Sequence, residues 1–169
     1  ILHPSDIGLA HEDLTITTAE GIPLHCWLIK AEGEARGTVI FLHGVSECVI
    51  VGLPIARRLH DAGFHVFLYD SRRHGDSGGQ FCTYGFYEKH DTSTMISYLE
   101  SRQDLRLGKI GLLGSSMGAA VAIQVAALDA RVASVLAESG FATLRTVYDE
   151  YQKRIIKVPW HSLRNIVIK

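Results

Sequence analysis

The sequence has few of the features that mark several specialised classes of protein. Its 169 residues include only three cysteines, Cys26, Cys48 and Cys82, and none of them stands in a C-x-x-C or Cys/His zinc spacing. We therefore expect reduced, structural thiols and no metal site. No apolar run approaches the ~20 residues of a membrane-spanning helix, and no secretory signal segment opens the chain.

An excess of charge of one sign is also missing. Lysine and arginine together number 17 and aspartate and glutamate 18, which gives a formal net charge of -1 and a pI near 6.8. Such a chain has no global field that attracts nucleic acid, so no nucleic-acid partner is expected. The chain begins with Ile1 rather than Met, which leaves its location in the cell open, with the cytoplasm favoured.

The composition that is present suits a folded domain. Hydrophobic residues make up 47% and charged residues 21%, and the length is sufficient for one domain with a sizeable core. The chain shows no internal repeat, low-complexity tract or Pro/Gly-rich linker that would divide it. One domain is therefore predicted.

Hydrophobic periodicity predicts alternating strands and helices. Strands are expected at 14–17, 24–29, 38–42, 65–70, 109–114 and 131–139. Helices are expected at 53–62, about 91–101 and 116–128, with Asp91 as the N-cap of the second. The later strands are unbroken apolar runs, which are typical of a parallel sheet covered on both faces. This predicts a doubly wound, three-layer α/β fold with ligands at the carboxyl ends of the strands.

One short stretch carries the strongest sign of chemistry. Residues 114–118 read Gly-Ser-Ser-Met-Gly, which fits G-x-S-x-G, and they join a predicted strand to a predicted helix. The glycines suit a turn so sharp that the central serine is strained and side chains two residues away would collide. We interpret Ser116 as a nucleophile supported by Gly114 and Gly118. An ordinary glycine-flanked helix cap is the simpler alternative.

A second stretch, Phe-Leu-His-Gly at 41–44, ends an earlier strand. At this place the backbone N–H of Val45 can face the serine. Together with the N–H of Met117 it would form a two-donor oxyanion hole for the tetrahedral intermediate of acyl transfer. His43 precedes the serine in the chain, so we expect His43 and Gly44 to shape the loop rather than to supply a base.

Four segments, in this order, carry a resemblance to a known family. They are VIFLHG at 39–44, FLYDSRRHGDSGG at 67–79, IGLLGSSMGAA at 110–120 and VLAESGFATL at 135–144. From about residue 12 to about residue 145 the chain resembles the α/β-hydrolase superfamily, especially its serine aminopeptidase-like and esterase-like branch. The loop after the predicted strand at 65–70 commonly reads D-x-R-G-H-G-x-S in relatives, and this chain has Arg73 where glycine is usual.

The resemblance implies that a catalytic acid and then a histidine follow the serine. The carboxylates after Ser116 are Asp129, Glu138, Asp149 and Glu150. Some relatives draw the acid from the strand end that here carries Glu138, whereas in others the acid comes later. His161 is the only histidine after the serine and lies 22 residues beyond Ser139. Because each strand–helix–strand crossover needs about 30 residues, a lid or surface position is favoured for His161.

The C-terminal stretch is expected to begin a different part of the molecule. We expect an incomplete hydrolase core at 1–140, truncated after the sixth strand, and the start of a lid or connecting helical segment at 141–169. Residues 145–169 carry six lysines and arginines against two acidic residues, in an amphipathic pattern. This pattern favours a cap over the active site and, less, contact with an acidic membrane surface.

The sequence therefore predicts a serine hydrolase that cleaves carboxylic esters or related acyl compounds through an acyl-enzyme on Ser116. A small acyl compound is the expected substrate, and no metal or organic cofactor is implied. The alternative is a non-catalytic binding module that kept the fold and lost its acid and base.

Overall fold

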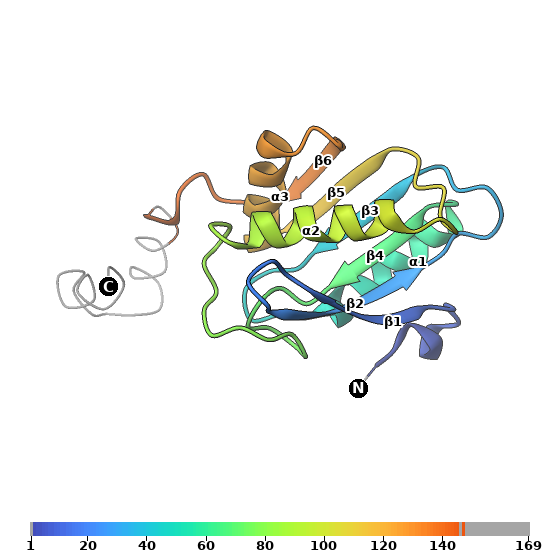
Figure 1. The fold of residues 1–169 in the computed structure, drawn as a ribbon, viewed down its shortest axis with the longest axis horizontal. Helices are drawn as coiled ribbons and strands as arrows, with labels where there is room; N and C mark the ends of the chain where they lie inside the picture. Colours follow the sequence, from blue (N-terminus) through green and yellow to red (C-terminus); the bar gives the residue numbers. More distant parts are fainter. Residues whose placement is uncertain (1, 146, 148–169) are drawn as a thin grey trace.

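A six-stranded sheet forms the centre of the computed structural model, which describes residues 2–145 and 147 (Figure 1). The strands lie in the order β1-β2-β4-β3-β5-β6. Their bounds are Glu12–Thr17 for β1, Pro23–Ile29 for β2, Thr38–Leu42 for β3, His65–Tyr69 for β4, Ile110–Ser115 for β5 and Val132–Glu138 for β6. The neighbouring strands β4, β3, β5 and β6 run parallel to one another. At the other side of the sheet, β2 pairs antiparallel with β4, and β1 pairs antiparallel with β2. The predicted, mostly parallel α/β sheet is confirmed.

Helices cover both faces of this sheet. The helix α1 (Leu53–Asp61) lies on one face, and α2 (Glu88–Ser101) and α3 (Met117–Leu128) lie on the other (Figure 1). Two short 3-10 helices, η1 (Pro4–Ile7) and η2 (Val49–Gly52), precede β1 and α1. Within the described ranges, 2–145 and 147, no helix has the length and apolarity needed to cross a membrane.

Each face of the sheet has its own hydrophobic core. On the α1 side, Trp27 and Phe41 pack with Leu53 and Ala56. On the other side, Phe67 packs with Met95 of α2 and Val121 of α3. The central strand β4 is buried along its whole length, as its unbroken apolar sequence predicts, whereas the side chains of the edge strand β6 are half-buried or exposed.

The start of α2 differs from the prediction. The helix begins at Glu88 with Tyr87 as its N-cap, so the expectation that Asp91 caps it is wrong. Asp91 lies one turn inside the helix, where its two carboxylate oxygens accept hydrogen bonds of 2.7 Å from Nε and Nη2 of Arg72. A long-range ion pair, which local sequence cannot show, fixes this carboxylate. The next residue in the loop, Arg73, has φ of 64°, the left-handed region that the glycine usual in relatives would favour.

This ion pair leads to a prediction about stability. Asp91→Ala leaves the Arg72 guanidinium, whose side chain is only 6% exposed, with exposed Glu20 as its one remaining carboxylate partner. We expect urea unfolding to show a loss of about 3 kcal/mol, since removing one partner leaves a buried charge poorly compensated. Glu34→Ala, which breaks the fully exposed pair with Arg106, is the control and should change little. Equal losses in the two variants would contradict the prediction.

Candidate active site

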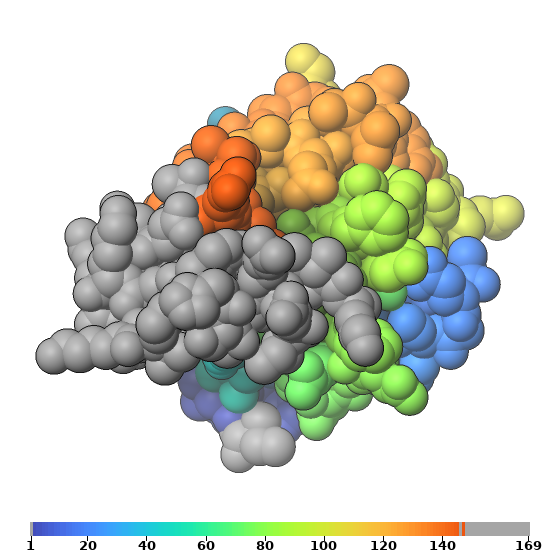
Figure 2. All heavy atoms as spheres, turned by 90° about the vertical axis from the view of Figure 1, so that its left-hand side faces the viewer, coloured from blue at the N-terminus to red at the C-terminus, as the bar shows by residue number. Residues whose placement is uncertain are grey.

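The candidate site lies at the edge where the parallel strands end. His43 follows β3 by one residue, Asp70 follows β4, and Ser116 follows β5. Figure 2 looks onto this side of the molecule, where the last described residues, coloured orange to red, lie beside the green loop that precedes α2. A ring contact between Tyr84 and Phe141, with centroids 6.3 Å apart, joins these two segments. The expected location of ligand chemistry in such a sheet is this edge.

Ser116 occupies a sharp turn from β5 into α3. Its φ of 52° and ψ of -112° lie outside the regions that L-residues usually adopt, at a cost of about 1–3 kcal/mol. A Cβ on Gly114 would collide with the backbone of Gly118. A Cβ on Gly118 would collide with the carbonyl oxygen of Leu42 and lie 2.8 Å from that of His43. Both glycines are therefore required by close backbone approaches.

The backbone around this turn is held on both sides. The N–H of Ser116 donates to the carbonyl of Glu138 at 2.9 Å, and the carbonyl of Ser116 accepts from Ala120 at 3.3 Å. Ser116 is the N-cap residue of α3, which places it at the positive end of the helix dipole. The backbone of the turn is thus anchored to β6 on one side and to the first turn of α3 on the other.

The loop after β3 closes against the same serine. A Cβ on Gly44 would lie 3.3 Å from the Cβ of Ser116, and Glu47 Oε2 accepts the N–H of Gly44 at 2.7 Å. Within residues 2–145 and 147, the N–H groups of Val45 and Met117 donate to no other described group. Among the described residues, the two segments next to Ser116, namely the loop after β3 and the first turn of α3, each carry one backbone N–H without a hydrogen-bond acceptor.

His43 is completely buried at the end of this loop. Its Nδ1 donates to the Gly44 carbonyl at 2.7 Å, and its Nε2 accepts the N–H of Ser71 at 2.9 Å. Burial lowers the pKa of this imidazole, which is consistent with a neutral ring protonated on Nδ1. Because both ring nitrogens are engaged, the geometry suits a residue that fastens two loops and leaves neither nitrogen for proton transfer.

Asp70 is a second organising residue, and the sequence analysis did not single it out. Its buried carboxylate accepts the N–H of Val49 at 2.7 Å and that of Asp76 at 3.1 Å, and it contacts Nδ1 of His25 at 3.1 Å. A Cβ on Gly75 would collide with the same carboxylate. Its position directly after a buried strand was the signal that could have identified it.

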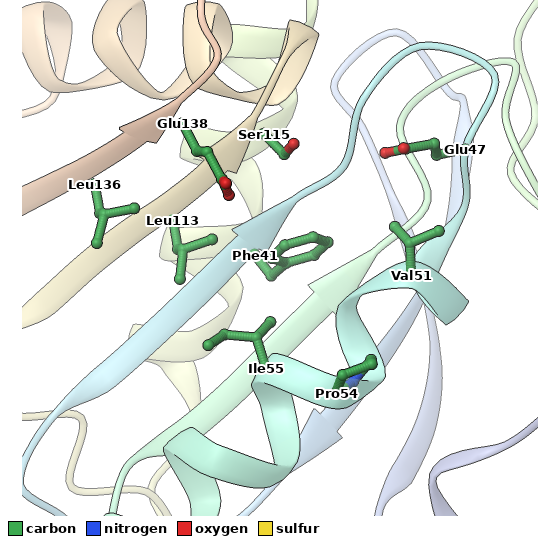
Figure 3. A pocket seen from close by; sticks show the side chains of 9 residues that line it. All are labelled: Phe41, Glu47, Val51, Pro54, Ile55, Leu113, Ser115, Leu136 and Glu138. Atoms are coloured by element: carbon green, nitrogen blue, oxygen red, sulfur yellow. The ribbon is translucent and has the colours of Figure 1, made fainter.

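A pocket of about 390 Å³ lies beside the site on the α1 face of the sheet (Figure 3). Glu47, Ser115 and Glu138 line it at the strand ends, and apolar side chains line it below, namely Phe41, Val51, Pro54, Ile55, Leu113 and Leu136. The pocket therefore receives Ser115, the neighbour of Ser116 in the motif, and it receives Glu138 from β6. No histidine is among its lining residues in the described part of the chain.

The remaining acid and base candidates lie elsewhere. Asp129 follows the far end of α3, where Arg131 lowers the pKa of its carboxyl group to about 2 through hydrogen bonds of 2.6 and 2.8 Å. Asp149, Glu150, His161 and most of the basic segment 145–169 lie outside the described residues. The structure thus brings together Ser116, Gly44, Val45 and Met117, and His43, at the start of the same loop, has both ring nitrogens engaged.

His43 generates a prediction about pH. The folded-state pKa values of His43 and His65 both lie below the ordinary 6.5, because both rings are buried, so the unfolded chain binds more protons in this window. The stabilising contribution is present above pH 6.5 and is lost as the pH falls through the folded pKa, by at most about 1.4 kcal/mol per pH unit for each histidine. The free energy of unfolding, measured with urea between pH 7.5 and 5, should fall less steeply with decreasing pH in His43→Asn than in the wild type.

The matched control is His90→Asn, since His90 is exposed on α2. In this variant the unfolding free energy should change with pH as steeply as in the wild type. A His43→Asn protein whose unfolding free energy changes with pH as steeply as the wild type would show that His43 is not the titrating group.

Comparisons with known proteins place the chain in a family and agree with its fold. Residues 33–166 match the hydrolase family described as serine aminopeptidase, S33. The chain is 42% identical over 93 residues to the uncharacterized protein YqkD of Bacillus subtilis, covering 55% of this chain and 30% of YqkD. It is 26% identical over 144 residues to the alpha/beta hydrolase domain-containing protein WAV2 of Arabidopsis thaliana, covering 83% of this chain and 46% of WAV2.

A solved structure shows the same arrangement of strands and helices. The esterase Pf2001 of Pyrococcus furiosus aligns with a TM-score of 0.83 and 29% identity over 99% of this chain and 65% of the esterase chain. The chain thus spans between about a third and two thirds of the lengths of these three proteins. With the family match extending over most of its residues, the chain belongs to the serine aminopeptidase S33 family of α/β hydrolases.

Proposed function

We propose that the protein is a serine hydrolase in which Ser116 attacks carboxylic esters or related acyl compounds. The observation that carries the proposal is the strained backbone of Ser116 at the N-terminus of α3, with φ of 52° and ψ of -112°. A non-glycine residue persists in such a conformation only where the surroundings enforce it, and strain of this kind gathers at functional sites. In G-x-S-x-G hydrolases the same turn lifts the nucleophile clear of the sheet.

The surroundings of Ser116 suit the chemistry of acyl transfer. As Oγ of Ser116 bonds to the acyl carbon, the carbonyl oxygen gains negative charge. The N–H groups of Val45 and Met117, which donate to no other described group, would hold that oxyanion. The bond from the acyl carbon to the alcohol oxygen then breaks, and the alcohol leaves with the proton that the base took from Ser116, which gives an acyl-enzyme. Water attacks the acyl carbon next, the carboxylic acid leaves, and Ser116 takes back a proton. The N-terminus of α3 adds its dipole to the stabilisation of the same charge.

The base that activates Ser116 is proposed to come from residues other than the described ones. A serine hydroxyl is a weak nucleophile until a neighbouring base takes its proton. His43 is buried with both ring nitrogens engaged, and His161 lies outside the described residues. Glu138 stays the predicted acid of the triad. Its side chain lines the pocket together with Ser115, the neighbour of Ser116.

Esters are the favoured substrates because one solved structure that the chain resembles, at 29% identity, is that of the esterase Pf2001. Peptides remain the alternative that the family description suggests. The proposal needs no metal or organic cofactor, because serine, imidazole and backbone amides suffice for acyl transfer.

The decisive experiment is covalent labelling of the natively expressed protein with a fluorophosphonate. Oγ of Ser116 should attack the phosphorus and expel fluoride, which adds one adduct to the intact mass, mapped to Ser116. Ser116→Ala should take up no label and lose at least about 10³-fold in the rate of p-nitrophenyl acetate hydrolysis. Ser115→Ala is the matched control and should still react. A folded protein without label or hydrolysis would favour the non-catalytic binding module.

The oxyanion hole is tested separately at Val45. Val45→Pro removes one N–H, and we expect kcat for the ester to fall about 10²–10³-fold while KM changes little. Val45→Ala keeps the N–H and should retain most of the activity. Thermal unfolding of both variants checks that the loop still folds. Equal kcat values for the proline and alanine variants would remove Val45 from the site.

A further inference from the structure

Three metal-ligating side chains gather at the edge of the sheet formed by β1. His3 precedes η1, His11 precedes β1, and Asp13 is the second residue of β1. One ring nitrogen of each histidine and one carboxylate oxygen of Asp13 all lie within 4.8 Å of one another. Neither the proposed catalytic residues nor the pocket includes any of the three.

An indole ring positions both histidines. The centroid of Trp27, which is 1% exposed, lies 5.7 Å from that of His3 and 5.9 Å from that of His11. Trp27 belongs to β2 and pairs with Asp13 in the sheet register. Both imidazoles therefore rest against a rigid element of the core, although they come from a segment outside the sheet.

The carboxylate is oriented by two further groups. Nε1 of Trp27 donates to Oδ2 of Asp13 at 3.2 Å, and Nε2 of His25 lies 3.2 Å from Oδ1. His25 in turn contacts the buried carboxylate of Asp70 through Nδ1 at 3.1 Å. In metal sites, the side chains that bind the metal are commonly held in orientation by such hydrogen-bonding neighbours.

From this arrangement we propose that His3, His11 and Asp13 bind a divalent transition-metal ion, of which Zn²⁺ fits best. Two imidazoles and one carboxylate form a donor set that Zn²⁺ prefers, with water in the fourth position. Ligand atoms around tetrahedral Zn²⁺ stand about 3.3 Å apart, because each lies about 2.0–2.1 Å from the metal. Small rotations of the two rings would close the present spacing of up to 4.8 Å.

The position of the cluster indicates a structural role for the ion. In the sheet, β2, β4 and β3 lie between β1 and β5, the strand that leads to Ser116. An ion held by His3, His11 and Asp13 would tie the segment around η1 to the first strand. We therefore expect bound metal to raise the stability of the protein and not to take part in hydrolysis.

The experiment is isothermal titration of the EDTA-dialysed protein with Zn²⁺, repeated with Co²⁺ to record its visible absorption. We expect one ion per chain, a Co²⁺ spectrum typical of four or five ligands, and a higher unfolding temperature with Zn²⁺. His11→Ala and Asp13→Asn should each weaken binding at least about tenfold. Trp27→Phe, which removes the N–H to Asp13 together with part of the ring that contacts His3 and His11, should weaken it about 10–100-fold.

His90→Ala is the matched control, since His90 is an exposed histidine on α2. It should bind Zn²⁺ like the wild type. Circular dichroism of each variant confirms that it is folded. The proposal is overturned if folded wild-type protein takes up no Zn²⁺ at 1 mM, or if His11→Ala and His90→Ala bind it equally well.

Discussion

The close approach of the first turn of α3 to the end of β3 is the constraint on which the site depends. At Gly118 the helix meets the carbonyl oxygens of Leu42 and His43 so closely that a methyl group would not fit. This contact sets the depth of α3 against the sheet and brings Ser116 against Gly44. The strained serine, the loop that faces it and the packing of α3 on β5 and β6 all depend on close approaches that the absence of side chains at Gly114 and Gly118 permits.

Buried carboxylates hold the loops at the same edge. Asp70 satisfies backbone N–H groups from the loop after β3 and the loop after β4, and Asp91 secures Arg72. Glu88, also buried, accepts the N–H groups of Thr83 and Gly85. Loops without strand or helix ladders must satisfy their buried donors in another way, and here carboxylates do so. The irregular segments around Ser116 are therefore fixed by charge-assisted hydrogen bonds as well as by the packing of apolar residues such as Val45 and Val49.

The sequence alone allowed the elements and the serine turn to be predicted, because both depend on local patterns. Apolar runs marked the strands to within a few residues, and two glycines around Ser116 marked the turn. Asp91 was misplaced because its partner, Arg72, lies 19 residues away, and no local rule links the two. The cluster at His3, His11 and Asp13 was missed for a similar reason, since Trp27 on the next strand brings these side chains together.

The two edges of the sheet present different physical problems. Among the described residues, the side chains of β6 are largely exposed, with Leu136 59% exposed, and β6 pairs with β5 alone. At β1 the strand pairs only with β2, and a single residue of β1, Ile16, is buried. Edge strands with so little core of their own gain most from contacts outside the sheet. For β1 such contacts come from the preceding segment, through buried Leu9 and through the histidines that rest on Trp27. An ion there would add to the contacts that hold β1, whose own residues bury little apolar surface.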